Sequence, residues 1–247
     1  MLAHAEQCIE EATELARDLS VNDPNVGLPL LGKCLRECED LAGFSGRLAN
    51  AVAFLREQLA VYRELATIQP ALYEERLADA LSGYVSASTR FGENEEALNA
   101  SREAADLYRR LVAREPGRYE FTLANELRPL SERLVEAGRF DEALQCAEEA
   151  ASTFVQLYDA ASAGDPERKK FDYNLALSLA TLANCLDANA QFAKALEISK
   201  AAVERMHRIV APLDIMFGFS QWEDYRLILD AYEHRRRRAA LRSNSDS

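Results

Sequence analysis

Apolar side chains recur at helical spacing along most of the chain. One stripe steps by four, three and four residues through Leu123, Leu127, Leu130 and Leu134, a spacing that places all of them on one face of a helix. A second amphipathic run extends from Ala143 to Leu157. Between the two, Gly138 is suited to end a helix in the left-handed conformation, and Asp141 with Glu142 is suited to begin the next one. The pattern therefore predicts a pair of helices joined by a tight turn.

The same pair recurs at a fixed offset of 46 residues. Segments 62–78 and 108–124 share Tyr, Leu, Pro, Tyr, Leu and Ala at equivalent positions. The same offset connects Gly46 to Gly92 and Gly92 to Gly138. It lengthens to 52 residues between Ala143 and Ala195, where residues 160–170 read as a longer loop. A repeated two-helix unit predicts that neighbouring units stack to bury a continuous core.

These pairs resemble the tetratricopeptide (TPR) signature, in which an A helix and a turn precede a B helix that opens with Ala. The match is fullest over residues 127–143 and 179–195. Because the ordinary repeat has about 34 residues, the resemblance implies B helices that are longer by roughly three turns. The long form is similar to kinesin light chain repeats and to arrays attached to bacterial and fungal signalling ATPases and caspase-like effectors. The implied fold class is all-α: a right-handed superhelical array of antiparallel helix pairs, a TPR-like α-solenoid.

This resemblance implies a single repeat domain over residues 1–242. Its expected parts are an orphan B helix at 1–19, helix pairs at 27–67, 72–114, 118–163 and 167–210, a capping helix at 219–242, and a disordered tail at 243–247. Phe217, Phe219 and Trp222 are expected to seal the last repeat. The start on a B helix indicates either a fragment of a longer array, which we favour, or an unusual N-terminal cap.

Composition narrows the class of partner. The formal net charge of −12 disfavours a general nucleic-acid binder or a protein adsorbed to anionic membrane. Every long apolar stretch is interrupted by charge, so neither a secretory signal nor a membrane span is expected. Low Gly and Pro contents, 10 and 7 residues, favour helices over a loop-rich β fold.

Nothing in the sequence predicts an enzyme or a cofactor site. There is no Gly-rich phosphate loop, nucleophile elbow or metalloprotease-type His pair, and paired acids such as Glu148 and Glu149 are adjacent, which suits a solvated helix face. Cys34 and Cys38 lie one helical turn apart, but no His has the spacing to complete a zinc site. The cysteines are expected to be free thiols in a reducing, cytoplasmic compartment.

The resemblance implies a concave groove lined by A-helix side chains. The residues carried onto it are Lys33, Arg36, Asp40, Asp79, Ser82, Ser86, Arg90, Asn125, Arg128, Glu132, Thr181, Asn184 and Asp187. Some TPR proteins clamp a peptide carboxylate with an ordered Lys/Asn/Asn/Lys/Arg set. The corresponding places here are Arg36, Asp40, Gly83, Asn125 and Pro129. These residues lack two of the Asn side chains of the clamp and add an Asp, so a carboxylate clamp is disfavoured. The expected groove is polar and of mixed charge.

Two features stay open to more than one interpretation. Pro129 lies inside a helical stripe, where it is either a tolerated kink or a bend that widens the groove. The basic run Arg235–Arg238 is either a solvated helix end that opposes the macrodipole, or a targeting or docking signal with nuclear import as one outcome.

The function expected from these features is a non-enzymatic adaptor or scaffold that binds a protein or peptide segment in its concave groove. The alternative is a regulatory sensor or oligomerisation repeat of a larger signalling ATPase or caspase-like effector, acting through self-association or attachment. An RNA-binding helical repeat is disfavoured by the net charge.

Overall fold

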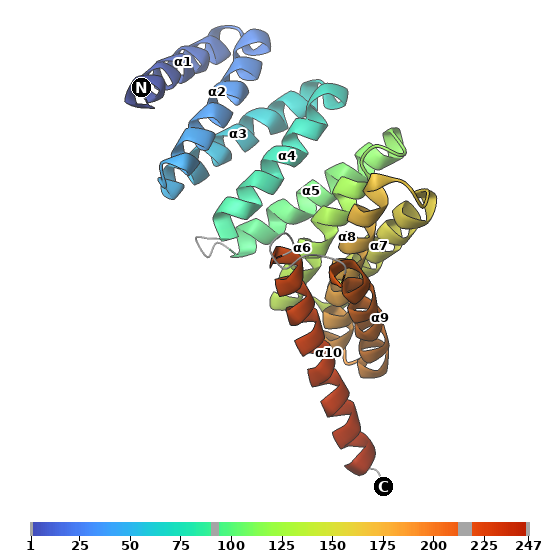
Figure 1. The fold of residues 1–247 in the computed structure, drawn as a ribbon. Coiled ribbons are helices and arrows are strands. Elements are labelled where there is room, and N and C mark those ends of the chain that lie inside the picture. The colour runs from blue at the N-terminus through green and yellow to red at the C-terminus, as the bar shows by residue number, and fades with distance from the viewer. Residues whose placement is uncertain (1, 90–93, 212–218, 246–247) are drawn as a thin grey trace. The chain divides into compact units, whose positions relative to one another are not determined.

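The structure, a computed structural model, describes residues 2–89, 94–211 and 219–245. These residues form ten helices and no strand (Figure 1). The first five are α1 (Leu2–Asn22), α2 (Pro24–Phe44), α3 (Leu48–Ile68), α4 (Pro70–Thr89) and α5 (Asn94–Arg114). The others are α6 (Glu120–Glu136), α7 (Phe140–Ala160), α8 (Pro166–Ala188), α9 (Phe192–Val210) and α10 (Phe219–Ser245). The all-α class expected from the sequence is confirmed.

The described residues divide into two compact units. Unit 1 is Met1–Pro116 and contains α1 to α5; unit 2 is Gly117–Ser247 and contains α6 to α10. Within each unit, consecutive helices pack against each other. The division falls where Pro116 cannot continue a helix and Gly117 takes a φ of +92°.

The helices at the N-terminus are longer than the sequence indicated. The helix α1 reaches Asn22 instead of 19, and α2 begins at Pro24 instead of 27. Pro24 starts α2 at once, because its fixed φ suits the first turn of a helix and its missing N–H has no partner there anyway. Gly27 then permits a very close crossing, since a Cβ at this position would lie 2.1 Å from the backbone nitrogen of Ser20.

Among the described residues, the turns between A and B helices follow the glycine pattern in two pairs and break it in one. Gly46 and Gly138 take φ values of +70° and +72°, as their position after a helix predicts. Gly92, the equivalent residue of the second pair, lies outside the described residues. In the last pair Ala190 occupies this place with a φ of +57°, a conformation that is strained for a residue with a Cβ.

Unit 1 is held by apolar layers and by ion pairs between successive B helices. Leu35, Leu81 and Leu111 are fully buried in its core. On the B helices, Arg17 forms a two-point pair with Glu57, at 2.7 and 2.8 Å, and Arg63 forms another with Glu103, at 2.9 and 2.6 Å. Both pairs span 40 residues, so the same contact joins α1 to α3 and α3 to α5.

Unit 2 is built around aromatic and aliphatic packing. Phe154 is fully buried against Ala124 and Leu175. A second cluster joins α8, α9 and α10 through Ala176, Ala202, Met206, Val210 and Ile228, with Trp222 and Tyr225 packed against it. Trp222 thus contributes to sealing the last repeat, whereas Phe217 and the side chain of Phe219 lie outside the described residues.

The C-terminal helix corrects a detail of the sequence expectation, and two helices contain an interior proline. The helix α10 continues to Ser245, so residues 243–245, expected in a disordered tail, are helical, and its last turns extend past α9 (Figure 1). The helix α6 runs through Pro129 without ending. The helix α2 also contains an interior proline, Pro29, which the sequence pattern did not single out.

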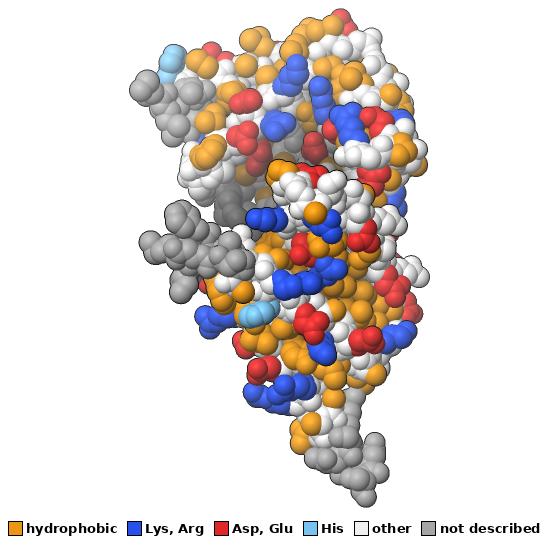
Figure 2. Space-filling view, turned by 45° about the vertical axis from the view of Figure 1, so that its right-hand side comes forward, with side chains coloured by type: hydrophobic (Ala, Val, Ile, Leu, Met, Phe, Trp, Pro, Cys, Tyr) orange, Lys and Arg blue, Asp and Glu red, His pale blue; other side chains and the backbone are white. Residues whose placement is uncertain are grey.

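The surface carries both signs of charge. On the face shown in Figure 2, acidic and basic side chains are interspersed with apolar ones. The net charge of −12 is therefore not gathered into one acidic field on this face. Among the described residues, no helix has the length and apolar character needed to cross a membrane.

Candidate functional site

Unit 1 contains a polar groove between α2 and α4, floored by α3. Its cavity measures about 640 Å³. The lining residues are Lys33, Arg36, Glu37, Glu39 and Asp40 on α2, Leu55, Gln58 and Tyr62 on α3, and Arg76, Asp79, Ala80 and Gly83 on α4. The structure therefore brings together four of the predicted groove residues: Lys33, Arg36, Asp40 and Asp79.

Two glycines shape the walls of this groove: one lets α2 pack closely on α3, and the other leaves space on the α4 wall. Gly32 lies against Tyr62, and a Cβ there would approach the Tyr62 ring to 2.9 Å. The buried Gln58 side chain donates a 3.1 Å hydrogen bond to the Gly32 carbonyl, which fixes α3 against α2. On the opposite wall, a Cβ at Gly83 would meet only Leu55, at 3.6 Å, so the groove has room for a side chain at this position.

The charged side chains on the α2 wall have no partner among the described residues. Lys33, Arg36, Glu37 and Asp40 are exposed, and no hydrogen bond or ion pair within the described part of the chain engages them or Glu39. Burial, and then the neighbouring charge of Asp40, raises the pKa of Glu39, while Arg36 opposes the shift. Unlike these groups, Asp79 accepts a 2.6 Å hydrogen bond from the Tyr108 hydroxyl.

The remaining predicted positions on α4 do not serve the groove in the same way. Ser82 donates to the Ala78 carbonyl at 3.1 Å, and Ser86 donates to the Ser82 carbonyl at 3.0 Å. Both hydroxyls are thus bonded within their own helix, a common arrangement for helical Ser. Arg90 lies outside the described residues.

The prediction from the TPR resemblance did not include several side chains that line the groove. Glu37, Glu39, Tyr62 and Arg76 line the cavity but were not among the expected residues. A signal was available for two of them, because Glu37 follows Lys33 by four residues and Arg76 precedes Asp79 by three, so each shares a helix face with an expected residue. Tyr62 belongs to the B helix, which the resemblance left out of the groove.

In unit 2 the predicted groove residues are engaged in contacts within and between helices. Asn125 donates to the Phe121 carbonyl at 3.0 Å. Glu132 accepts a 3.0 Å hydrogen bond from Thr181, whose side chain is buried, and pairs with Arg128 at 4.0 Å. The Glu132–Thr181 hydrogen bond connects α6 directly to α8.

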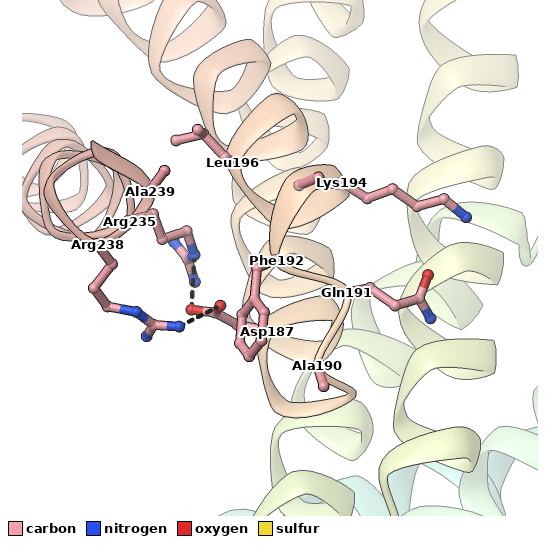
Figure 3. A pocket seen from close by; sticks show the side chains of 10 residues that line it. Asp187, Ala190, Gln191, Phe192, Lys194, Leu196, Arg235, Arg238 and Ala239 are labelled. Carbon is pink, nitrogen blue, oxygen red and sulfur yellow. Dashed lines mark hydrogen bonds and ion pairs between the residues drawn. The ribbon is translucent and has the colours of Figure 1, made fainter. Parts of the chain in front are cut away.

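The last two predicted residues are held by the C-terminal helix. Arg235 donates to Asn184 at 2.5 Å. It also donates to Asp187 at 3.1 Å, and Arg238 donates to Asp187 at 3.2 Å (Figure 3). The Arg238 guanidinium also lies 5.1 Å from the Phe192 ring centroid. We call these contacts of Arg235 and Arg238 with Asn184, Asp187 and Phe192 the arginine clamp.

The arginine clamp corrects the interpretation of the basic run as a solvated helix end. The Arg235 side chain is only 8% exposed, whereas Arg236 and Arg237 are exposed. Burial lowers the pKa of Arg235, and Asp187 opposes that shift. The run spans one turn of α10, so Arg235 and Arg238 share a face that meets α8, while the two residues between them point elsewhere.

A cavity of about 700 Å³ opens beside the arginine clamp. Its apolar walls are Ala190, Phe192, Ala193, Leu196 and Ala239, and Asp187 within it is already bonded to both arginines (Figure 3). This cavity differs from the groove in unit 1, where the lining charges of α2 have no hydrogen-bond or ion-pair partner within the described part of the chain.

The chemistry available at these sites is recognition by charge and shape. Within the described ranges, no group of three His, Cys, Asp or Glu side chains is arranged to hold a metal ion. All five cysteines are free thiols, and burial raises the pKa of Cys185 to about 11, so this thiol is protonated at neutral pH.

Comparisons with known proteins address the fold. No protein-family model matches the chain, and no curated protein matches it. The structure is similar to that of BtubC (BKLC) from P. vanneervenii, with 20% identity, a TM-score of 0.54, and coverage of 98% of this chain and 92% of that one. It is also similar to a kinesin light chain structure from Podosopora anserina with nearly identical TPR-like repeats, at 16% identity and a TM-score of 0.53, covering 85% of this chain and 93% of that one. The TPR-like repeat fold expected from the sequence is confirmed.

Proposed function

We propose that this TPR-like repeat chain is a non-enzymatic interaction module that binds a segment of a partner protein in the groove of unit 1. One observation supports this most directly: the charged side chains of α2 line an open groove and have no hydrogen-bond or ion-pair partner among the described residues. TPR-like repeats are commonly protein-interaction modules. A partner that supplies complementary charges would therefore satisfy groups that the fold leaves unsatisfied.

The mixture of charges favours a protein segment over a polyanion. Lys33, Arg36 and Arg76 share the groove with Glu37, Glu39 and Asp40. Nucleic acid presents phosphate of one sign and would be repelled by the acids, whereas a peptide can place both signs. Because the charges are solvated in the free protein, they are expected to set specificity and association rate more than total affinity.

A charge-reversal experiment tests this proposal. Wild-type protein and the Lys33→Glu/Arg36→Glu variant are immobilised, and proteins retained from extract of the source cells are quantified by mass spectrometry. The matched control is Lys169→Glu/Arg208→Glu, which makes the same change in net charge at two exposed residues of unit 2. A Gly83→Leu variant provides a second test, because it fills the groove and leaves every charge in place.

The expected result is a set of proteins retained by wild type and by the control, and reduced at least about tenfold by both groove variants. Circular dichroism and thermal melting of all four proteins exclude unfolding as the cause. Retention of the same proteins, in the same amounts, by the two groove variants would contradict the proposal.

A second candidate function, a repeat segment within a larger assembly, is favoured by one observation on α1. Leu15 is 70% exposed, whereas the residues at the same repeat position, Val61 and Leu107, are 6% and 2% exposed. In α3 and α5 this position is covered, so a further helix covering α1 would restore the pattern. Cross-linking from a photoreactive residue at position 15 tests this idea; exclusive reaction with water would contradict it.

A further inference from the structure

Two rows of residues lie on the helices that form the walls of the unit 1 groove. Lys33, Glu37, Asp40, Arg76, Asp79 and Gly83 line the cavity, and the other members continue the same helix faces beyond it. Each row steps by four and three residues, which keeps its members on one helix face. The α2 row is Val26, Leu30, Lys33, Glu37 and Asp40, and the α4 row is Leu72, Arg76, Asp79, Gly83 and Ser86. The rows match at an offset of 46 residues, and both helices run antiparallel to α3 (Figure 1). Equivalent residues therefore lie at equivalent heights on two parallel helices.

The chemistry of these rows changes along the groove. At the N-terminal ends of the two helices the rows are apolar, with Val26, Leu30 and Leu72 exposed by 48%, 42% and 52%. Basic side chains follow, and acidic ones come last. The basic members of the groove are Lys33, Arg36 and Arg76, and the acidic members at the far end are Glu37, Glu39 and Asp40.

One acid lies at the level of the basic side chains, but it is already bonded. Asp79 is equivalent to Lys33 in the repeat, and it accepts the hydrogen bond from Tyr108. The change from basic to acidic is therefore carried by the side chains of α2 and by Arg76, which are the groups that a ligand can reach without displacing an existing hydrogen bond.

The length of this graded surface suits a short extended segment. From Val26 to Asp40 the helix rises about 21 Å, at about 1.5 Å per residue. An extended chain covers that distance with about six or seven residues, at roughly 3.3 Å each. Each of the three levels therefore faces about two residues of such a segment.

We propose that the groove reads the order of chemistry in an extended protein segment: apolar residues against Val26, Leu30 and Leu72, then acidic residues, then basic residues against Glu37, Glu39 and Asp40. This inference rests on the proposed function and names the class of partner. A segment of the same composition with its charges exchanged places like charges together, and a segment of one sign satisfies only half of the groove.

Four fluorescein-labelled peptides test this order by fluorescence anisotropy at low salt. Two have the matching order, Leu-Leu-Ser-Asp-Asp-Lys-Lys and its reverse. Two have the charges exchanged, Leu-Leu-Ser-Lys-Lys-Asp-Asp and its reverse. The expected result is that one matching peptide binds at least about tenfold more tightly than both exchanged peptides, with a difference that shrinks as salt is added. Which matching peptide binds gives the direction of the segment.

A charge-exchanged protein provides the reciprocal test. The variant Lys33→Glu/Arg36→Glu/Glu37→Lys/Asp40→Lys keeps the net charge and changes only side chains without partners among the described residues. It is expected to prefer the exchanged peptides, and the Lys169→Glu/Arg208→Glu control is expected to keep the wild-type preference.

Two results would overturn the proposed order: equal binding of matching and exchanged peptides, or no binding of any of the four peptides at millimolar concentration. Neither result would change the interpretation of the extract experiment with Lys33→Glu/Arg36→Glu, which tests binding in the groove without these peptides. The failure of the charge order and the failure of the groove as a binding site are therefore distinguishable.

Discussion

The same class of residue, a polar side chain on the inner face of an A helix, has opposite roles in the two units. In unit 1, Lys33 and Arg36 face an open groove and have no partner among the described residues. In unit 2, Glu132 and Asp187 receive hydrogen bonds from the next A helix along the chain. Glu132 is equivalent in the repeat to Asp40 of unit 1, but only Glu132 receives a hydrogen bond from a neighbouring A helix.

This difference between the units shows that the position of a residue in the repeat does not by itself identify a binding residue. A polar group in a groove contributes to the fold when a neighbouring helix satisfies it, and it remains available to a ligand when none does. Here α10 provides that neighbour, through Arg235 and Arg238. Each of the following changes tests this division between fold and binding.

The largest effect is expected at the arginine clamp. Arg235→Ala leaves Asn184 without its donor and Asp187 with Arg238 alone. Removing one partner of a buried ion pair is strongly destabilising, so a loss of about 2–4 kcal/mol in the free energy of unfolding is expected. Urea denaturation measures it, with Arg236→Ala as the exposed control, expected to change stability by less than about 0.5 kcal/mol. Equal effects of the two substitutions would show that the clamp does not hold unit 2.

A smaller effect is expected between α6 and α8. Thr181→Val keeps the shape of a buried side chain and removes the hydroxyl that donates to Glu132. A loss of about 1 kcal/mol is expected, the usual net contribution of one hydrogen bond. The comparison in unit 1 is Asp40→Ala, which removes an exposed group without a partner among the described residues and is expected to leave the urea midpoint nearly unchanged. A larger loss for Asp40→Ala than for Thr181→Val would reverse the comparison.

The turns of the two units predict opposite responses to glycine and alanine. Gly46→Ala places a Cβ at a φ of +70°, whereas Ala190→Gly removes one from a φ of +57°. The first change is expected to destabilise by about 1 kcal/mol and the second to stabilise by about 0.5–1 kcal/mol. Thermal melting of both variants checks the signs. Destabilisation by Ala190→Gly would mean that the Ala190 methyl group packs well enough to outweigh the strain.

The last effect appears only at alkaline pH and reports on unit 2. Burial raises the pKa of Cys185 from 9.0 to about 11, with a hydrogen bond involving Ser131 opposing the shift. Between these values the unfolded chain has released the thiol proton and the folded chain has kept it, so stability falls as pH rises through this interval. Urea denaturation of wild type and Cys185→Ala from pH 8 to 11 checks this. Parallel pH profiles of the two proteins would count against it.

Much of the fold was predictable from the sequence because it depends on local rules repeated along the chain. The 46-residue offset located the helix pairs, and Gly46 and Gly138 marked their turns through a conformation that favours glycine. The strained turn at Ala190 follows the same alignment at the longer offset of 52 residues. The division after Pro116 depends on packing between helices, which the repeat pattern does not describe.

The site was predictable only in part. The repeat alignment placed Lys33, Arg36, Asp40 and Asp79 on one groove, but it also selected Glu132 and Asp187, whose partners lie 49 and 48 residues further along the chain. The basic run from Arg235 to Arg238 indicated a solvated helix end because Arg side chains near a helix C-terminus oppose the macrodipole. Only the packing of α10 against α9, beside α8, shows that Arg235 is buried.

The most direct test of this division compares two charge reversals of equal size, one in each unit. Lys33→Glu/Arg36→Glu and Arg235→Glu/Arg238→Glu are each measured for the free energy of unfolding in urea and for retention of the proteins that wild type binds. The account predicts that the first variant loses binding and keeps its stability, while the second loses several kcal/mol of stability because Asp187 then faces two acids. A first variant that unfolds at lower urea and a second that keeps wild-type stability would contradict it.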